Sequence, residues 1–158
     1  MILAKKIRLI FIMFFLGLLV LVAQVIPIRP VITIINHTNK YIYVFAGVSV
    51  YNVDPDPGEV ERIVKAKPEI IAPGGESVFT PSFISLFRKD AAIDISWRVG
   101  SQYEYNQTGG GGRNFILSSV EGSCSVLIKI KNGRNDDALE SVPGDLCLKK
   151  IKAFRYKY

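Results

Sequence analysis

An uninterrupted apolar run near the N-terminus constrains this chain more than any other feature. Residues 9–26 read LIFIMFFLGLLVLVAQVI and include one glycine, one glutamine and no charged residue. In an α-helix, these eighteen residues rise roughly 27 Å, which is close to the thickness of the hydrocarbon core of a bilayer. The run therefore predicts a single N-terminal transmembrane helix.

The basic residues around this run predict its orientation. Lys5, Lys6 and Arg8 precede it, whereas Arg29 is the only basic residue between the run and Lys40. Cytoplasmic flanks of membrane helices carry an excess of Lys and Arg. We therefore expect a single-pass inner-membrane protein, with residues 1–30 as cytoplasmic flank and signal-anchor. Residues 31–158 then form a domain in the periplasm or the extracellular space.

A cleaved signal peptide is the alternative interpretation of the same run. Both kinds of segment have a basic start and an apolar middle, but cleavage needs small residues at the cut. The best site places Ala23 before the cut and Leu21 two residues earlier, which is a poor match. The run is also longer than a usual signal-peptide core, so an uncleaved anchor is favoured.

Residues 31–158 are enough for one domain with a hydrophobic core and too few for two. The whole chain has a net charge of +6, but four of its twenty basic residues flank the apolar run. The domain keeps sixteen basic residues and all fourteen acidic ones, a net charge of +2. This balance gives no support to nucleic acid as a partner.

Cys124 and Cys147 both fall in the translocated part of the chain, where thiols are normally oxidised. We predict that they form a disulfide, which closes a loop of about 23 residues and stabilises the fold by roughly 3 kcal/mol. Two buried free thiols are the alternative. His37 is the only histidine, so we predict no metal site.

Short strand patterns recur through the domain. Residues 31–35 and 41–51 are expected to form a hairpin. Ile93, Ile95, Trp97 and Val99 alternate with polar residues, which predicts a strand with one buried face that turns at Gly100 and pairs with residues 102–105. Further strands are expected at 60–66, 70–72, 77–79, 115–120 and 124–131, and from Cys147 onward, with Cys124 on the core-facing side.

One short helix is expected with Thr80 as its N-cap and Pro81 as its first helical residue. Phe83, Leu86 and Phe87 share a face of this helix that we assign to the core. About eight short strands between Pro/Gly turns predict an all-β domain. The expected fold is an antiparallel β-sandwich of immunoglobulin-like or transthyretin-like topology. Trp97 precedes both cysteines, so the Cys–Trp–Cys order of true immunoglobulin domains is absent.

Three loops are candidate binding surfaces, since loops on a rigid scaffold commonly carry binding. Residues 54–61 hold four carboxylates between prolines, but the spacing of a calcium-binding EF-hand loop is absent, which favours a solvated acidic loop over a calcium site. Residues 109–113 are four glycines followed by Arg113. They lack the Lys-Ser/Thr of a phosphate loop and predict a flexible hairpin tip.

The third candidate loop is a polar excursion at residues 133–145. We expect at least one of the three loops to contact a protein partner. The leading residues for partner binding are Asp54, Asp56 and Arg113.

No group of residues in the sequence indicates a reaction. The only histidine is His37, in a predicted turn, so Ser-His and Cys-His pairs have no second component. We expect a non-catalytic protein without a cofactor: an accessory or assembly subunit of a bacterial envelope or secretion complex that binds other envelope or membrane proteins. The alternatives are an immunity-type or inhibitor-type protein that neutralises a toxin at the membrane, and a small hydrolase of unfamiliar type.

Overall fold

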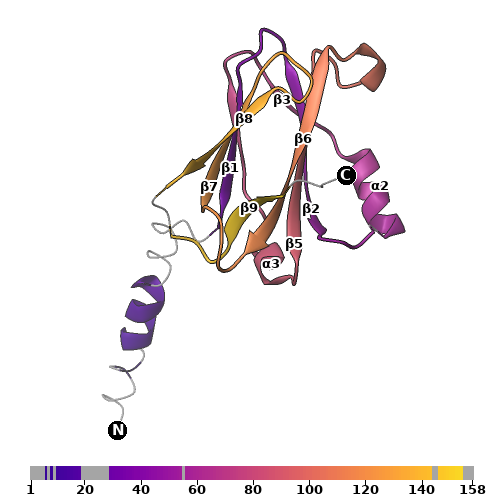
Figure 1. Cartoon of the computed structure of the whole chain (residues 1–158). Coiled ribbons are helices and arrows are strands. Elements are labelled where there is room, and N and C mark those ends of the chain that lie inside the picture. Colours follow the sequence, from indigo (N-terminus) through magenta and orange to yellow (C-terminus); the bar gives the residue numbers. More distant parts are fainter. Residues whose placement is uncertain are drawn as a thin grey trace.

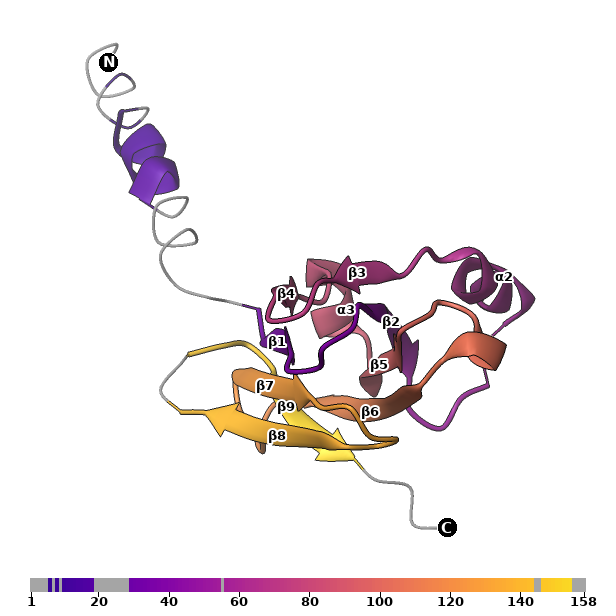
Figure 2. The same cartoon turned by 90° about the horizontal axis from the view of Figure 1, so that it is seen from above.

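Two β-sheets pack face to face in this computed structural model, which describes residues 6, 8, 10–18, 29–54, 56–143 and 146–154 (Figure 1 and Figure 2). The four-stranded sheet has the order β4 (Glu76–Phe79), β1 (Val31–Asn36), β7 (Ser125–Ile130) and β8 (Asp137–Val142). The five-stranded sheet has the order β3 (Glu69–Ile71), β2 (Ile42–Val50), β5 (Ala91–Val99), β6 (Gly109–Ser118) and β9 (Lys150–Phe154). The predicted β-sandwich with a short helix, α3 (Phe83–Phe87), is confirmed at this level.

The core lies between the two inner faces and follows the period-two pattern of the strands. Along β5, the side chains of Ile93, Ile95, Trp97 and Val99 are all buried, as the alternation predicts. Cys124 is also buried, at the start of a run in which Val126, Ile128 and Ile130 face the core. Burying one such large apolar side chain contributes about 1.5–3 kcal/mol, so these faces hold the two sheets together.

The sandwich is mixed and not purely antiparallel, which corrects the predicted arrangement. β1 pairs with β7 in parallel, from Val31 opposite Ser125 to Asn36 opposite Ile130, whereas the other pairings between the described strands are antiparallel. Parallel neighbours need a long connection. Here the connection includes the first four strands of the other sheet, so no local turn restricts the direction of β7.

The predicted hairpin of residues 31–35 and 41–51 is wrong, because β1 and β2 lie in different sheets. The side chain of Asn36, which is fully buried, fixes the crossing: its Nδ2 donates to the carbonyl oxygens of Lys40 (2.8 Å) and Ile71 (3.0 Å). Its Oδ1 accepts from the backbone N–H of Thr38 (2.9 Å). The corner therefore turns the chain out of one sheet and into the other.

The predicted strand at residues 60–66 is a helix, α2 (Pro57–Lys65). Asp56 caps it, because its carboxylate accepts the backbone N–H of Glu59 at 2.8 Å, and Pro57 occupies the first helical position. An N-cap Asp followed three residues later by Glu resembles a capping box. This capping signal is present in the sequence, and it favours a helix more strongly than the β-branched residues of the segment favour a strand.

The predicted glycine-rich hairpin tip at residues 109–113 is also wrong, because these residues begin strand β6. A Cβ at Gly111 would lie 2.6 Å from Cζ2 of Trp97, so the glycine lets the strand pass against the indole ring. Residues 102–105 do not form a strand either. The chain instead makes a 3-10 turn, η1 (Glu104–Asn106), before it enters β6.

Two more predictions need correction. The polar excursion at 133–145 contains an edge strand, β8, whose Glu140 side chain pairs with Lys129 of β7 across the sheet. Helix α3 begins after an N-cap at Ser82, two residues later than expected, and of its expected core face only Leu86 is buried. Phe83 and Phe87 are exposed because α3 covers the end of the sandwich with a single turn.

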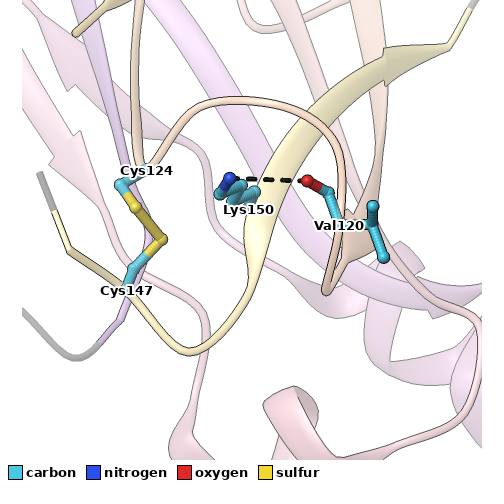
Figure 3. Close-up of a disulfide and its surroundings, with 4 residues drawn as sticks. All are labelled: Val120, Cys124, Cys147 and Lys150. Atoms are coloured by element: carbon cyan, nitrogen blue, oxygen red, sulfur yellow. Dashed lines mark hydrogen bonds between the residues drawn. A yellow bond between two sulfur atoms is a disulfide. The ribbon is translucent and has the colours of Figure 1, made fainter. Parts of the chain in front are cut away.

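The disulfide between Cys124 and Cys147 is confirmed, with 5.7 Å between the two Cα atoms (Figure 3). It ties the start of β7 to the segment before β9, which begins at Lys150 and not at Cys147. Disulfides persist in oxidising compartments, so the bond indicates an extracytoplasmic domain.

Part of the predicted transmembrane run falls outside the described residues, namely residues 9 and 19–26. Residues 10–18 are helical. In the part of the chain that the structure describes, no helix has the length and hydropathy needed to span a bilayer.

The disulfide generates the first prediction. Replacing both Cys124 and Cys147 by Ser should lower the free energy of unfolding by about 2–4 kcal/mol, because the unfolded chain regains the freedom of the closed loop. Urea unfolding of the two proteins, followed by the fluorescence of Trp97, measures this difference. Equal midpoints would contradict the stabilising role, and two labelled thiols in the unreduced protein would contradict the bond itself.

Candidate functional site

A groove of about 580 Å³ lies on the outer face of the five-stranded sheet, beside α2. Strands β2 and β5 form its floor, and their register places Phe45 opposite Ser96 and Gly47 opposite Asp94. The other side chains used below that line the groove are Ser49, Glu59 and Arg98. Figure 1 and Figure 2 show α2 on the side of the five-stranded sheet that faces away from the four-stranded one.

A carboxylate is held in place at one end of the groove. Ser49 Oγ donates to Asp94 Oδ2 at 2.5 Å. The side-chain amide of Asn114, on the neighbouring strand β6, lies 3.2 Å from Asp94 Oδ1 and donates to it when its nitrogen is turned toward the carboxylate. Because both oxygens accept from a neighbouring strand, the charge of Asp94 has a fixed position on the sheet.

A guanidinium group is held in place at the other end. Arg98 lies over the ring of Phe45, 5.4 Å from its centroid, and its Nη1 donates to the carbonyl oxygen of Gln102. Asp94 and Arg98 are four residues apart on the same face of β5, a separation of about 13 Å along the strand. The groove therefore presents an apolar strip between two charges of opposite sign, an arrangement that suits an extended peptide segment.

A second cavity of about 390 Å³ shares Ser49, Glu59 and Asp94 with the groove. Asp54 lines it. The rings of Tyr51 and Phe154, which also line it, meet edge to face at 4.9 Å between centroids. The two cavities share residues of β2, β5 and α2, so we treat them as one surface, the α2 groove.

The structure separates the three predicted partner-binding residues. Asp54 lines the α2 groove, whereas the carboxylate of Asp56 is used to cap α2. Arg113 faces the interior of the sandwich, where its Nε donates to Oδ2 of Asp137 at 2.6 Å. This ion pair joins β6 of one sheet to β8 of the other. The two side chains are only 15% and 2% exposed, respectively.

The sequence signalled the charged residues of the groove but not their role. Asp94 and Arg98 are the polar partners in the alternation that predicts β5, so their outward direction follows from the pattern. Their use as a site depends on a helix beside the same face of the sheet. The sequence analysis missed that helix because it predicted a strand at residues 60–66.

Among the described residues, no three His, Cys, Asp or Glu side chains converge to hold a metal ion. No protein-family model matches this chain, and no curated protein matches it significantly.

The ion pair between the sheets generates the second prediction. Arg113→Ala should lower the free energy of unfolding by about 3–5 kcal/mol, because it leaves the buried carboxylate of Asp137 without its partner. Lys129→Ala is the matched control: it also breaks a pair between strands, with Glu140, but both side chains are partly exposed. We expect it to cost at most about 1 kcal/mol.

Denaturant unfolding of the two variants beside the unsubstituted protein measures both values. Similar small losses in the two variants would show that the pair between Arg113 and Asp137 is not structural. In that case Arg113 would return as a candidate for partner binding.

Proposed function

We propose that this chain is a membrane-anchored, non-catalytic binding protein on the extracytoplasmic side, an accessory or assembly subunit of a bacterial envelope or secretion complex. The α2 groove is the observation that supports this proposal. Its apolar strip between fixed opposite charges suits a segment of another envelope protein, which would place a basic residue at Asp94 and an acidic one at Arg98.

The chemistry of the groove favours binding over catalysis. The Ser49 hydroxyl donates its hydrogen to the carboxylate of Asp94, and a carboxylate is a much weaker base than the histidine imidazole that usually activates a serine nucleophile. The single histidine, His37, follows β1 at the crossing between the sheets, where its backbone N–H donates to the carbonyl oxygen of Ile130. It thus belongs to the corner at the end of β1 and not to the groove.

The disulfide and the apolar run support the proposed location. Only residues 27–30 separate the run from β1, so an uncleaved run would hold the domain close to the membrane surface. A partner in the same envelope would then meet the α2 groove from the side.

A substitution that fills the groove tests the binding proposal. Gly47 lies in its floor, and a Cβ at this position would have no heavy atom within 4 Å. Gly47→Leu should therefore leave the fold intact and block the partner. We expect partner recovery after crosslinking in intact cells to fall about ten-fold or more, which corresponds to about 1.4 kcal/mol of binding free energy.

Ser141→Leu is the control, because it adds the same side chain at an exposed position on the edge strand β8. Equal recovery of stoichiometric partners with both variants would rule out the groove as the binding site. Recovery of a secreted toxin in place of envelope subunits would favour the immunity-type alternative.

Retention of the apolar run generates a separate prediction. The mature protein should keep residues 1–26 and stay in the membrane fraction after washing with alkaline carbonate, because the run is long enough to span and its cleavage site is poor. Mass spectrometry of the purified protein determines its N-terminus. A mature chain that begins at or after Gln24 would show that the run is a cleaved signal peptide.

A further inference from the structure

One end of the sandwich collects exposed apolar side chains from three separate segments. The most exposed are Ile84 (83%) and Phe87 (71%) of α3. The complete set, which we call the apolar end, is Phe83, Ile84, Phe87, Val120, Leu146 and Leu148. Exposed apolar groups gathered in one region of a soluble domain mark an interaction surface.

The strand register places these segments at the same end. Ile32, near the start of β1, is opposite Phe79, which leads into α3. Ser125 of β7 is opposite Val31 on one side and Val142 on the other, so the segments before β7 and after β8 lie beside the start of β1. Figure 1 shows α3 and the start of β1 at this end, and η1 at the far end of β5.

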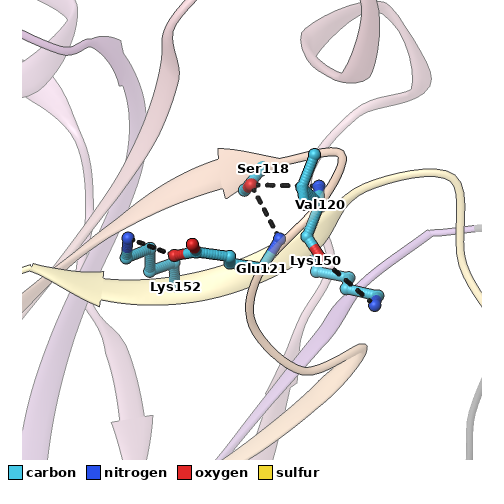
Figure 4. A network of polar contacts seen from close by, with 5 residues as sticks. All are labelled: Ser118, Val120, Glu121, Lys150 and Lys152. Carbon is cyan, nitrogen blue, oxygen red and sulfur yellow. Dashed lines mark hydrogen bonds and ion pairs between the residues drawn. The ribbon is translucent and has the colours of Figure 1, made fainter.

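Basic residues follow or precede the segments of the apolar end in the chain. They are Arg29, Arg88, Lys89, Lys149 and Lys150. Lys149 Nζ donates to Ser119 Oγ at 2.6 Å. Lys150 Nζ donates to the carbonyl oxygen of Val120 at 3.4 Å, as Figure 3 and Figure 4 show. Both lysines therefore lie against the loop that presents the exposed Val120.

Among the described residues, two acidic side chains accompany these basic ones. Glu121 pairs with Lys152 (Figure 4), and the hydrogen bond from that ammonium group, followed by its charge, lowers the pKa of the Glu121 carboxyl. Asp90 is exposed beside Lys89. The five basic residues thus outnumber these two, and the described part of the apolar end carries a net positive charge.

We infer that the apolar end is an interfacial surface that rests on a bilayer containing anionic phospholipid. Ile84, Phe87 and Val120 enter the boundary between headgroups and acyl chains, while the flexible stems of the lysines and arginines bring their charges to the phosphates. Each basic residue near such a surface raises the affinity about five-fold. Charge complementarity distinguishes this partner from an uncharged apolar surface.

Chain continuity supports the same partner. Arg29 and Pro30 enter β1 at this end, directly after the apolar run in the sequence. The orientation of the domain, with this end toward the bilayer, rests in part on the proposed anchoring. The gathering of apolar and basic side chains at this end is observed independently of that proposal.

A tryptophan placed on the surface reports its contact with lipid. Ile84→Trp puts the reporter on α3, and Tyr105→Trp is the matched control, because Tyr105 lies in η1 at the opposite end and is 80% exposed. Both variants keep the buried Trp97 as the same background. The full-length proteins are reconstituted in vesicles of phosphatidylcholine and phosphatidylglycerol whose acyl chains carry bromine, a quencher of indole fluorescence.

We expect the emission of Ile84→Trp to move to shorter wavelength and to be quenched, while Tyr105→Trp does neither. Adding Arg88→Glu and Lys89→Glu to the Ile84→Trp protein should reduce the quenching, as should vesicles of phosphatidylcholine alone. Quenching of Ile84→Trp no greater than that of Tyr105→Trp overturns the inference. If neither the two charge-reversing substitutions nor the uncharged phosphatidylcholine vesicles reduce the quenching, the assignment to anionic lipid is overturned.

Carbonate extraction of the same vesicles separates this inference from the anchoring proposal. A protein that resists extraction but shows no quenching contradicts only the lipid contact, and one that is extracted yet quenched before extraction contradicts only the anchor. Photocrosslinking from position 84 to a protein in cells, combined with no quenching in vesicles, would assign the surface to a protein partner and overturn the lipid contact.

Discussion

The path of the chain from one sheet into the other depends on the carboxamide of Asn36. It is fully buried, and it joins the end of β1 to the start of β2 through Lys40 and to the end of β3 through Ile71. Thr38 completes the corner, because both its N–H and its hydroxyl donate to Asn36 Oδ1. A buried amide left unsatisfied costs about 1–3 kcal/mol, so these bonds select one path for the chain between the sheets.

Some charged residues of the sandwich stabilise the fold from the inside, whereas others lie on its outer face and remain accessible to a partner. The charge of Arg113 is used inside the sandwich, where it joins β6 to β8 through Asp137. The disulfide closes the end at which β1 and β7 begin. Asp94 and Arg98 point away from the core on the same strand that carries the buried Trp97, so their positions are fixed without being needed for the core. Fixed charges on a rigid strand are suited to recognition because little order is lost when they bind.

The sequence predicted local features well and long-range features poorly. The alternation in β5, the disulfide and the short helix after Pro81 follow from neighbouring residues or from compartment, and the structure has all three. The parallel pairing of β1 with β7 joins segments about ninety residues apart, and nothing in either strand specifies its partner or direction. The glycines at residues 109–112 led to the wrong prediction of a hairpin tip because their cause is also a long-range contact. Gly111 is required by the indole ring of Trp97 on another strand, not by a turn. In the site, the sequence predicted Asp54 but not Asp94 and Arg98, because these two residues line a groove only through the position of α2 beside β5.

The two proposed surfaces constrain each other through strand β5. This strand begins next to α3 at the apolar end and runs to η1 at the far end, with Asp94 and Arg98 on its outer face. At about 3.3 Å per residue, Asp94 lies about 10 Å from Ala91 and Arg98 about 23 Å from it. When the apolar end rests on the headgroups, the α2 groove therefore opens sideways within a few nanometres of the bilayer. A partner segment bound there has to run close to the membrane surface, and proteins anchored in the same membrane present such segments at high effective concentration. The lipid contact would thus select the partners of the groove by holding it at a fixed height and direction, so the two surfaces would act together.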